Sequence, residues 1–399
     1  MTDTAPGPLT GMLVVDLSRA LAGPHATMML GDLGARVIKV ETPGTGDDTR
    51  GWGPPFVDPD DDAGDRESTY FLSANRNKES ITLDLKAEDD RAVLLDLVRR
   101  ADVLVENFRT GVLDRLRLGF DTLHELNPRL VVLSITGFGH DGPEGGRAGY
   151  DQIAQGEAGL MSLTGSGPDD PQKVGTPIAD LLAGMYGAYG VLAALHERNR
   201  TGQGTVVRTS LLSAVVGVHG FQSTRWTIAG EVGRAQGNHH ASIAPYGLFH
   251  CADGFVQIAV GSEKLWRRFC AGFDLDPETP GLETNAQRVA HRDRVIEVVE
   301  ERFAGWNAAD LLTRLDEVGI PAGKVRTVDE VYAWEQTRSQ GLLIDVDHRT
   351  LGRLQLPGPP LRFFDTGGQE VTRTAHTAPP PLDGDGAAIR AWLARGEQG

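Results

Sequence analysis

One aspartate stands between a turn and a long apolar segment, where a carboxylate could take part in chemistry. Asp180 follows the Gly-Thr-Pro sequence of residues 175–177 and precedes the nearly apolar stretch 181–195. A carboxylate ringed by apolar groups could act as a nucleophile toward an acyl group. Aspartate is also a preferred helix N-cap, so capping is the ordinary structural alternative. Small residues would line the helix face beneath it and admit another backbone or a slim ligand arm: Gly184, Gly187, Ala188 and Val191.

Cationic residues gather near the ends of predicted strands. Residues 105–117 follow one such strand, and open α/β folds bind ligands at the carboxyl ends of their strands. Residues 75–78 (Asn-Arg-Asn-Lys) and Lys86 place further cations at turns that flank another strand. Surface arginines on a solvated loop are the alternative, but local cations in an acidic chain favour a small anionic ligand. The polar and aromatic candidates of the first segment are Asn107, Phe108, Arg109 and Arg115.

The signatures of three other enzyme classes are missing from the sequence. Where dinucleotide-binding proteins carry G-x-G-x-x-G, residues 18–24 read Ser-Arg-Ala-Leu-Ala-Gly-Pro, so nicotinamide dinucleotide binding is not expected. No H-x-x-x-H or H-E-x-x-H spacing occurs, and no metal site is expected. No G-x-S-x-G motif of serine hydrolases occurs either. Cys251 and Cys270 are the only cysteines; they favour a cytoplasmic location and are assigned no catalytic role.

Composition excludes further classes of protein. The 399 residues include 39 Lys and Arg against 55 Asp and Glu, which gives a formal net charge of −16. This excess of acids repels a polyphosphate backbone, so no nucleic-acid partner is expected. The 50 glycines are spread along the chain and indicate many tight turns and close backbone approaches. Residues 1–11 lack the features of an export signal and residues 181–195 are short for a membrane span, so no membrane partner is expected.

Alternating strand-like and helix-like segments predict an α/β fold. Their order predicts a parallel sheet with helices on both faces. After about residue 230 the pattern becomes that of a smaller α+β unit, with a strand at 255–260 and helices within 297–318. The predicted strands of the first part are 12–17, 36–40, 80–85, 103–106 and 130–135, and the helices are 25–33, 88–100, one from Leu113, and a last one at 387–395.

These segments predict two domains joined by two linkers. The large domain spans residues 1–205 and is completed by 375–399. A first linker covers 206–230, the small α+β domain covers 231–325, and a return linker covers 326–374.

Several short motifs, taken in order, resemble the class III coenzyme A transferases, the CaiB/BaiF family that includes formyl-CoA transferase. The resemblance covers nearly the whole chain, and the ordered set is more specific than any single motif. The matching stretches are residues 15–17, 22–24, 33–41, 46–50, 75–80, 105–109, 149–151, 175–180, 200–204, 245–249 and 252–254.

The resemblance implies a Rossmann-like large domain, a smaller α+β domain and an interlocked homodimer. It implies acyl-CoA as the donor, a carboxylic acid as the acceptor and no permanently bound cofactor. Asp180 matches the family's catalytic aspartate. Leu21 stands where formyl-CoA transferase has a glutamine, and residues 237–242 replace the four-glycine loop of that enzyme. The residues that match the coenzyme A positions are Leu21, Ala22, Leu83, Lys86, Asn107, Phe108, Arg109, Arg115, Arg147 and Tyr150.

Two other functions are weighed beside transfer. The α-methylacyl-CoA racemases resemble this fold but use a histidine where Tyr150 stands. A phenol with a reference pKa near 10 is a poor replacement for that acid–base group, so transfer is favoured. A non-catalytic acyl-CoA-binding protein is the second alternative.

In the transfer reaction Asp180 is expected to form an acyl anhydride and then an aspartyl-CoA thioester. Main-chain N–H groups at the start of its helix and in a glycine-rich loop are expected to stabilise oxyanions. Asp151 is expected either to orient a substrate or to cap a helix. The candidates for holding the acceptor carboxylate are Arg19, Arg147, Arg225 and His239.

Overall fold

The structure is a computed structural model that describes residues 6–59 and 66–396. Residues 1–5, which belong to the segment considered for an export signal, and residues 397–399, the last of the predicted large domain, lie outside the described residues. The chain divides into two compact units. The first comprises Met1–Leu160, Val174–Thr227 and Glu335–Gly399, and the second comprises Met161–Lys173 and Ile228–Trp334.

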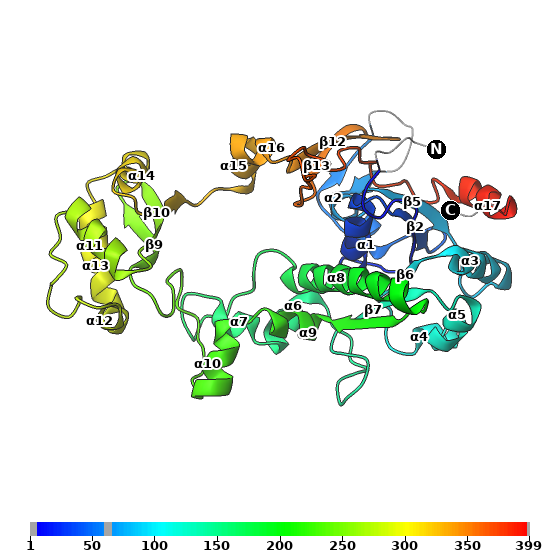
Figure 1. Ribbon diagram of the computed structural model, residues 1–399, viewed down its shortest axis with the longest axis horizontal. Helices are drawn as coiled ribbons and strands as arrows, with labels where there is room; N and C mark the ends of the chain where they lie inside the picture. Colours follow the sequence, from blue (N-terminus) through cyan, green and yellow to red (C-terminus); the bar gives the residue numbers. More distant parts are fainter. Residues whose placement is uncertain (1–5, 60–65, 397–399) are drawn as a thin grey trace. The chain divides into compact units, whose positions relative to one another are not determined.

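A six-stranded sheet forms the centre of the first unit (Figure 1). Its strands lie in the order β5-β2-β1-β6-β7-β8, and all neighbouring pairs are parallel. This confirms the predicted α/β class with a parallel sheet. The direction of strand addition reverses between β1 and β6, where open sheets of this kind bind ligands. The strands are β1 (Leu13–Asp16), β2 (Arg36–Glu41), β5 (Lys78–Thr82), β6 (Val103–Glu106), β7 (Val131–Thr136) and β8 (Val206–Ser210).

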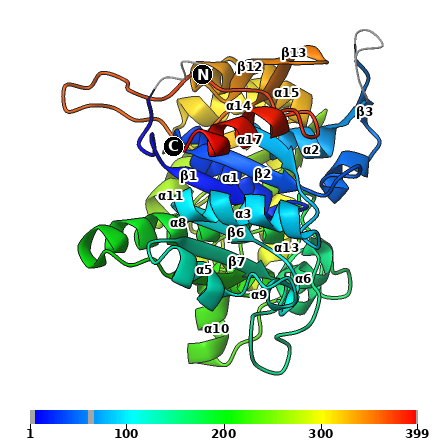
Figure 2. The same ribbon diagram turned by 90° about the vertical axis from the view of Figure 1, so that its right-hand side faces the viewer.

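Different helices cover the two faces of this sheet (Figures 1 and 2). Alternate strand residues point to opposite faces, so Val14 packs with one set of helices and Val15 with the other. The first set is α1 (Ala22–Asp32), α8 (Ile178–Thr201) and α9 (Leu211–Gly217). The second set is α3 (Glu88–Arg100), α5 (Phe120–Leu126) and α17 (Gly386–Ala394).

Helices α1 and α8 approach each other closely at Gly184. A Cβ atom at this position would lie 2.6 Å from the main-chain oxygen of Ala22 and 3.3 Å from the Cβ of His25. At Gly187 a Cβ would instead meet a methyl carbon of Leu133, on β7, at 2.8 Å. The small face predicted beneath Asp180 therefore accommodates the backbone of α1 rather than a ligand arm.

We expect Gly184→Ala to lower the free energy of unfolding by about 1–3 kcal/mol, because the carbonyl of Ala22 cannot move without moving α1. Gly187→Ala is the matched control in the same helix. Its added methyl would meet the end of the flexible Leu133 side chain, and we expect a change within about 1 kcal/mol. Urea unfolding measures both variants, and equal stabilities would contradict the close contact at Gly184.

Short elements complete the first unit. The pair β3 and β4 is antiparallel, as is the pair β12 and β13. These elements are η1 (Asp48–Gly51), β3 (Phe56–Val57), β4 (Glu67–Ser68), α2 (Thr69–Ser73), α4 (Val112–Arg115), α6 (Asp151–Glu157), α16 (Glu335–Ser339), β12 (Leu343–His348) and β13 (Gly352–Pro357). Two helices, α7 (Leu160–Leu163) and α10 (Phe221–Ala229), contain residues of both units.

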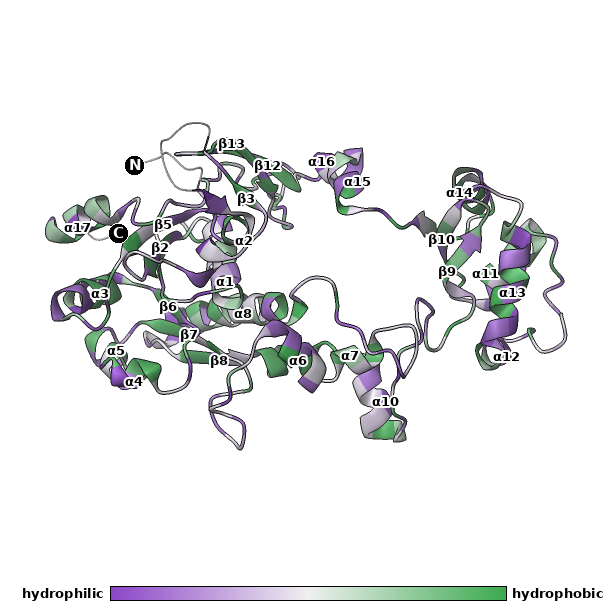
Figure 3. Ribbon diagram, turned by 180° about the vertical axis from the view of Figure 1, so that it is seen from behind, coloured by the Kyte–Doolittle hydropathy of each residue, from purple (hydrophilic) through white to green (hydrophobic). Residues whose placement is uncertain are grey.

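The second unit contains a three-stranded antiparallel sheet and its own apolar core. The strand order is β11-β10-β9, and the core includes Trp266, Phe269 and Phe303. Helix α13 alternates hydrophilic and hydrophobic residues along its length, as an amphipathic helix does (Figure 3). The elements are β9 (Tyr246–Cys251), β10 (Gly254–Ala259), α11 (Glu263–Gly272), α12 (Asn285–Ala290), α13 (Arg292–Phe303), α14 (Ala308–Glu317), β11 (Ala322–Lys324) and α15 (Val328–Ala333).

The segments predicted as linkers contain regular structure. Residues 206–210 of the first form the edge strand β8, and its α9 packs into the core of the first unit. Residues 343–357 of the second form the hairpin of β12 and β13. Strand β8 escapes sequence analysis because it has only five residues and Arg208 interrupts its apolar pattern. The domain boundaries themselves stay a prediction.

Among the described residues, α8 is long and apolar enough to cross a membrane by length and composition alone. Core helices of folded proteins meet the same two criteria. Helix α8 contributes buried residues to the core that it shares with α1, α9 and the sheet. We therefore assign it to that core.

Candidate active site

Asp180 lies in the first turn of α8, at its third residue. The N-cap position is held by Pro177, and no side chain of the N-cap residue bonds to the helix. The capping alternative for Asp180 is therefore wrong, because the helix begins three residues earlier than it would if Asp180 were the N-cap residue. A carboxylate in the first turn still faces the positive end of the helix dipole.

Asp151 caps α8 from another helix. Its Oδ1 accepts the main-chain N–H of Ala179 at 2.8 Å and that of Asp180 at 3.4 Å, while its Oδ2 accepts the side-chain amide of Gln155 at 2.7 Å. Of the two roles weighed for Asp151, the structure supports capping, though of α8 rather than of its own α6. It also corrects the expectation that these N–H groups stabilise oxyanions, because Asp151 already occupies them.

The electrostatic surroundings of Asp180 favour its neutral form. Burial, and then the neighbouring charge of Asp151, raise the pKa of Asp180 from 3.8 to about 7. A carboxylate of higher pKa is also a stronger nucleophile when ionised, and near neutral pH a substantial fraction of Asp180 carries its charge. Perturbed carboxylates of this kind cluster at functional sites.

Tyr70, on α2, is a site residue that sequence analysis missed. Burial, and then the negative charges of Asp180, Asp151 and Asp47, together raise its pKa to about 12. The phenol therefore stays neutral near pH 7 within the electrostatic range of three carboxylates. Its ring packs edge-on against Trp52, with centroids 5.0 Å apart. No motif surrounds Tyr70 in the sequence, so only the folded structure associates it with Asp180.

A cavity of about 460 Å³ opens at the carboxyl ends of β1 and β2 and extends to the loop after β6. Asp47 is one of the residues that line this cavity. The charges of Asp47 and of Asp180 both act on the Tyr70 hydroxyl. Five residues singled out by the sequence line this cavity: Arg19, Leu83, Lys86, Phe108 and Arg109. The structure thus gathers cations and an apolar wall from three separate segments of the chain.

Other predicted residues of the first unit support this cavity or lie apart from it. The side chains of Leu21 and Ala22 are buried at the start of α1. The amide of Asn107 accepts the Arg19 N–H at 2.8 Å and donates to the Arg19 carbonyl at 2.7 Å, which fixes the loop after β1. Arg115 ends α4 and does not line this cavity.

Four remaining candidates are placed as follows, of which Arg225 is a half-buried residue of α10. Arg147 forms ion pairs with Glu144 and Glu157 and lies over the ring of Phe138. Tyr150 is the N-cap residue of α6, and 67% of it is exposed. His239 belongs to the second unit, where its ring packs edge-on against Phe249.

The cations of residues 75–78 do not face a ligand. Arg76 forms a two-bond ion pair with Asp32, at 2.8 and 2.6 Å, and Lys78 pairs with Asp16 at 3.0 Å, all with buried side chains. This corrects their interpretation as part of an anion site, since each charge is already neutralised within the core. Lys78 instead stabilises the segment after β1 through Asp16, because the Oδ1 of Asp16 also accepts the Ser18 N–H at 2.9 Å.

No cluster of three or more His, Cys, Asp or Glu side chains that could hold a metal ion occurs in residues 6–59 and 66–396. Cys270 is buried in the core of the second unit, and burial raises the pKa of its thiol to about 12. Such a thiol stays protonated and is a poor nucleophile.

Known proteins are similar to the chain over nearly its full length. The model of a family described as CoA-transferase family III matches residues 9–385. A human protein named succinyl-CoA:glutarate CoA-transferase is 37% identical over 379 residues, covering 94% of this chain and 84% of that protein. An Agrobacterium fabrum protein named succinate–glutarate CoA-transferase is 40% identical over 342 residues, covering 85% of each. The crystal structure of a CaiB/BaiF family protein from Brucella suis has a TM-score of 0.85 and 39% identity, covering 97% of this chain and 100% of that one.

Proposed function

The chain belongs to CoA-transferase family III, and from this premise we propose that it moves coenzyme A from succinyl-CoA to a dicarboxylic acid of the glutarate type. Transfer of coenzyme A is the activity of the family. The choice of acids rests on the names of the human and Agrobacterium relatives. The observation that carries the chemistry is Asp180, a carboxylate with a raised pKa in the same unit as a cavity that presents cations.

In this proposal an oxygen of Asp180 attacks the thioester carbon of succinyl-CoA. The C–S bond breaks, coenzyme A leaves as the thiolate, and a mixed anhydride remains on Asp180. The thiolate then attacks the carboxyl carbon of Asp180, forming an aspartyl-CoA thioester and releasing succinate. The acceptor carboxylate attacks the carbonyl carbon of that thioester, the C–S bond breaks, coenzyme A leaves again as the thiolate, and a second anhydride forms. The thiolate then attacks the acceptor's acyl carbon in this anhydride, which gives the new acyl-CoA and releases the carboxylate of Asp180. Asp180 is regenerated, and no water, ATP or metal ion is consumed.

The surroundings of Asp180 favour the first step of this sequence. Burial and the charge of Asp151 destabilise the ionised carboxylate, whereas the anhydride is neutral. Acylation therefore removes an unfavourable charge and lowers the barrier relative to a solvated carboxylate. Asp151 holds two main-chain N–H groups at the start of α8, which fixes the turn that carries Asp180.

We propose that the 460 Å³ cavity holds the nucleotide part of coenzyme A. Lys86 and Arg109 line it, and neither side chain forms an ion pair with any residue that the structure describes, so both are available to phosphates. Phe108 offers an apolar wall for the base. Because the side chains of Leu21 and Ala22 are buried, contacts from these two residues would be made by main-chain atoms.

We expect Lys86→Gln to weaken coenzyme A binding about three- to tenfold, because one exposed phosphate-binding cation is removed. Titration calorimetry with coenzyme A measures this change. Lys264→Gln removes an equally exposed cation from α11 in the second unit and should leave the affinity within about twofold. Equal losses in both variants would indicate a general charge effect and contradict this placement.

An exchange screen tests the proposed reaction directly. Succinyl-, acetyl- and formyl-CoA are each mixed with mono- and dicarboxylic acids, and new acyl-CoA species are detected by mass spectrometry. We expect the largest rates with succinyl-CoA and C5 dicarboxylates. Binding without exchange would support an acyl-CoA-binding protein. Deuterium uptake at the α-carbon of a 2-methylacyl-CoA without an acceptor acid would support a racemase.

We also propose the Rossmann-like, interlocked homodimer that the family resemblance implies. Large apolar side chains on α8 and α10 support it, since exposed apolar patches usually mark contacts with another chain. Light scattering is expected to give twice the chain mass of 42.9 kDa. The exposed side chains are Met185, Tyr186, Tyr189 and Leu192 on α8 and Phe221 and Trp226 on α10.

A further inference from the structure

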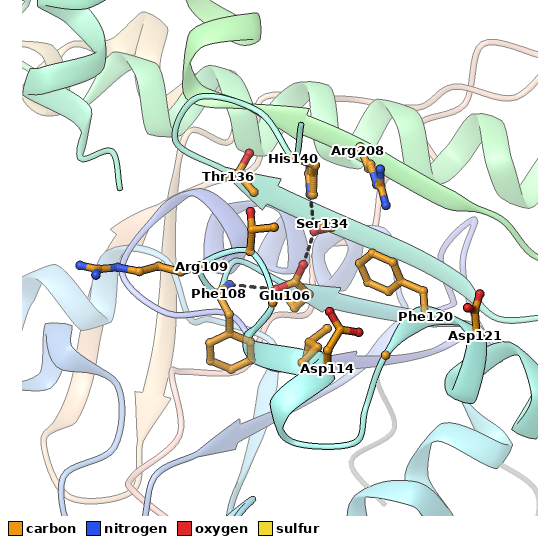
Figure 4. Close-up of a pocket in the computed structure, with 14 residues that line it drawn as sticks. Glu106, Phe108, Arg109, Asp114, Phe120, Asp121, Ser134, Thr136, His140 and Arg208 are labelled. Atoms are coloured by element: carbon orange, nitrogen blue, oxygen red, sulfur yellow. Dashed lines mark hydrogen bonds between the residues drawn. The ribbon is translucent and has the colours of Figure 1, made fainter. Parts of the chain in front are cut away.

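A second cavity of about 280 Å³ lies on the other side of the loop after β6 (Figure 4). It is lined by residues of β6, β7 and β8 and of the segments that form α4 and α5. Phe108 and Arg109 line both cavities, but every other residue of this second cavity differs from those of the first. Apart from Phe108 and Arg109, none of the residues that line it has a role in the proposed reaction.

A chain of hydrogen bonds forms the polar floor of the second cavity. The Oγ of Ser134 bonds to the carboxyl of Glu106 and, at 2.7 Å, to Nε2 of His140. Glu106 also accepts the Phe108 N–H at 2.9 Å. Glu106 and Ser134 are buried, so this floor is already satisfied and rigid without a ligand.

Among the described residues, two cations line this cavity without an ion pair: Arg109, which also lines the first cavity, and Arg208. Arg208, on the edge strand β8, lies beside His140 in Figure 4, and its guanidinium carbon is 5.6 Å from the ring centre of Phe120. The side chain forms no ion pair or hydrogen bond with any residue of the described part of the chain. The aromatic ring, rather than a carboxylate, therefore positions this charge at the cavity wall.

The other residues that line this cavity indicate which kind of anion it would bind. Phe108, Leu113 and Phe120 provide apolar surface, which favours a ligand with an apolar body. Asp114 and Asp121 also line the cavity, on the side away from His140 in Figure 4. These two carboxylates, together with Glu106, disfavour a ligand that carries more than one negative charge.

We propose that this cavity binds a small organic monoanion, with its carboxylate on Arg208 and its apolar body between Phe108, Leu113 and Phe120. Such a ligand is distinct from coenzyme A, whose phosphates carry several charges. The site shares Phe108 and Arg109 with the proposed coenzyme A cavity, but its residues include neither Asp180 nor Lys86, and Arg208 lines this cavity alone.

Benzoate is a suitable probe, since it joins one carboxylate to a flat apolar ring. Titration calorimetry with the full-length protein and no acyl-CoA is expected to give one site per chain with a Kd of about 1 mM or lower. Arg208→Gln should weaken benzoate binding about tenfold or more, and Arg208→Lys should retain most of it. Because Arg208 is exposed on an edge strand, both variants should keep the wild-type melting temperature.

A crossed pair of variants separates the two cavities. Lys86→Gln is expected to weaken the binding of coenzyme A and to leave the affinity for benzoate within about twofold of wild type. Arg208→Gln is expected to weaken the binding of benzoate and to leave the affinity for coenzyme A within about twofold. Benzoate binding that falls in Lys86→Gln but not in Arg208→Gln would place the anion in the first cavity and overturn the proposal. So would absence of binding up to about 20 mM benzoate, or tighter binding of inorganic phosphate than of benzoate. Failure of coenzyme A to bind any variant would count against the proposed function alone.

Discussion

Asp180→Ala is expected to reduce coenzyme A transfer by at least about 10³-fold while coenzyme A affinity stays within about threefold of wild type. The side chain is the proposed nucleophile, and the two anhydrides and the aspartyl-CoA thioester all form on its carboxyl group. Exchange between succinyl-CoA and glutarate measures the first quantity, and calorimetry measures the second. Transfer at the wild-type rate in this variant would eliminate the proposed mechanism.

Chemical trapping identifies the nucleophile independently of the substitution. Hydroxylamine added during turnover should modify the peptide that contains Asp180, because anhydrides and thioesters react with it and free carboxylates do not. The Asp180→Ala protein is the control and should remain unmodified there. Modification of another acidic residue, such as Asp151, would assign the nucleophile to that residue instead.

The Asn variant adds a prediction about stability. The native pKa of Asp180 is raised, so between pH 4 and pH 7 the native state holds a proton that the unfolded state releases. This contribution to stability is present at low pH and is lost as the pH rises through 7. Asn mimics the protonated form, so Asp180→Asn should exceed the wild type in stability at pH 8 by on the order of 2–4 kcal/mol. The difference should vanish near pH 4, and its persistence there would contradict a raised pKa.

The sequence predicts the parts of the fold that depend on local pattern. Helix Glu88–Arg100 and strand Val103–Glu106 are confirmed with the same boundaries, because each is a continuous amphipathic or apolar run with clear ends. Asp180 is a candidate for the same reason, since a turn and an apolar helix flank it. Strand β5 instead begins at Lys78, two residues before the predicted start, because the sequence cannot tell that this lysine is buried against Asp16.

What the sequence misses depends on pairing between distant segments. The ion pair of Lys78 with Asp16 joins residues 62 positions apart, and that of Arg76 with Asp32 joins residues 44 apart. In the sequence, Lys78 and Arg76 cannot be told from cations that bind a ligand. Only the folded chain shows that each one lies beside the carboxylate that neutralises it. Asp151 likewise caps α8 by accepting the main-chain N–H of Ala179, which is 28 residues further along the chain. Such partners leave no periodic signal, so Tyr70 and the cap from Asp151 emerge only from the structure.

The rate of transfer is expected to fall as the pH drops below 7, because only ionised Asp180 can attack the thioester. With a pKa of about 7, the ionised fraction falls about 50-fold between pH 7 and pH 5, and kcat/KM for succinyl-CoA should fall with it. Above pH 8 the rate should level off. A rate that is constant between pH 5 and pH 8 would contradict the raised pKa.

Asp151→Asn should move the midpoint of this profile to lower pH, since it removes the negative charge that opposes ionisation of Asp180. At pH 5.5 the variant should retain a fraction of its own pH 8 activity that is roughly threefold or more above the wild-type fraction. The Asn oxygen can still accept the Ala179 N–H, although its NH₂ group would oppose the donor amide of Gln155, so the absolute rate is expected to drop. Glu157→Gln removes a charge from the same helix without facing Asp180 and should leave the midpoint in place. An unmoved midpoint in Asp151→Asn, with only a lower rate, would reduce Asp151 to a helix cap and leave burial as the sole cause of the raised pKa.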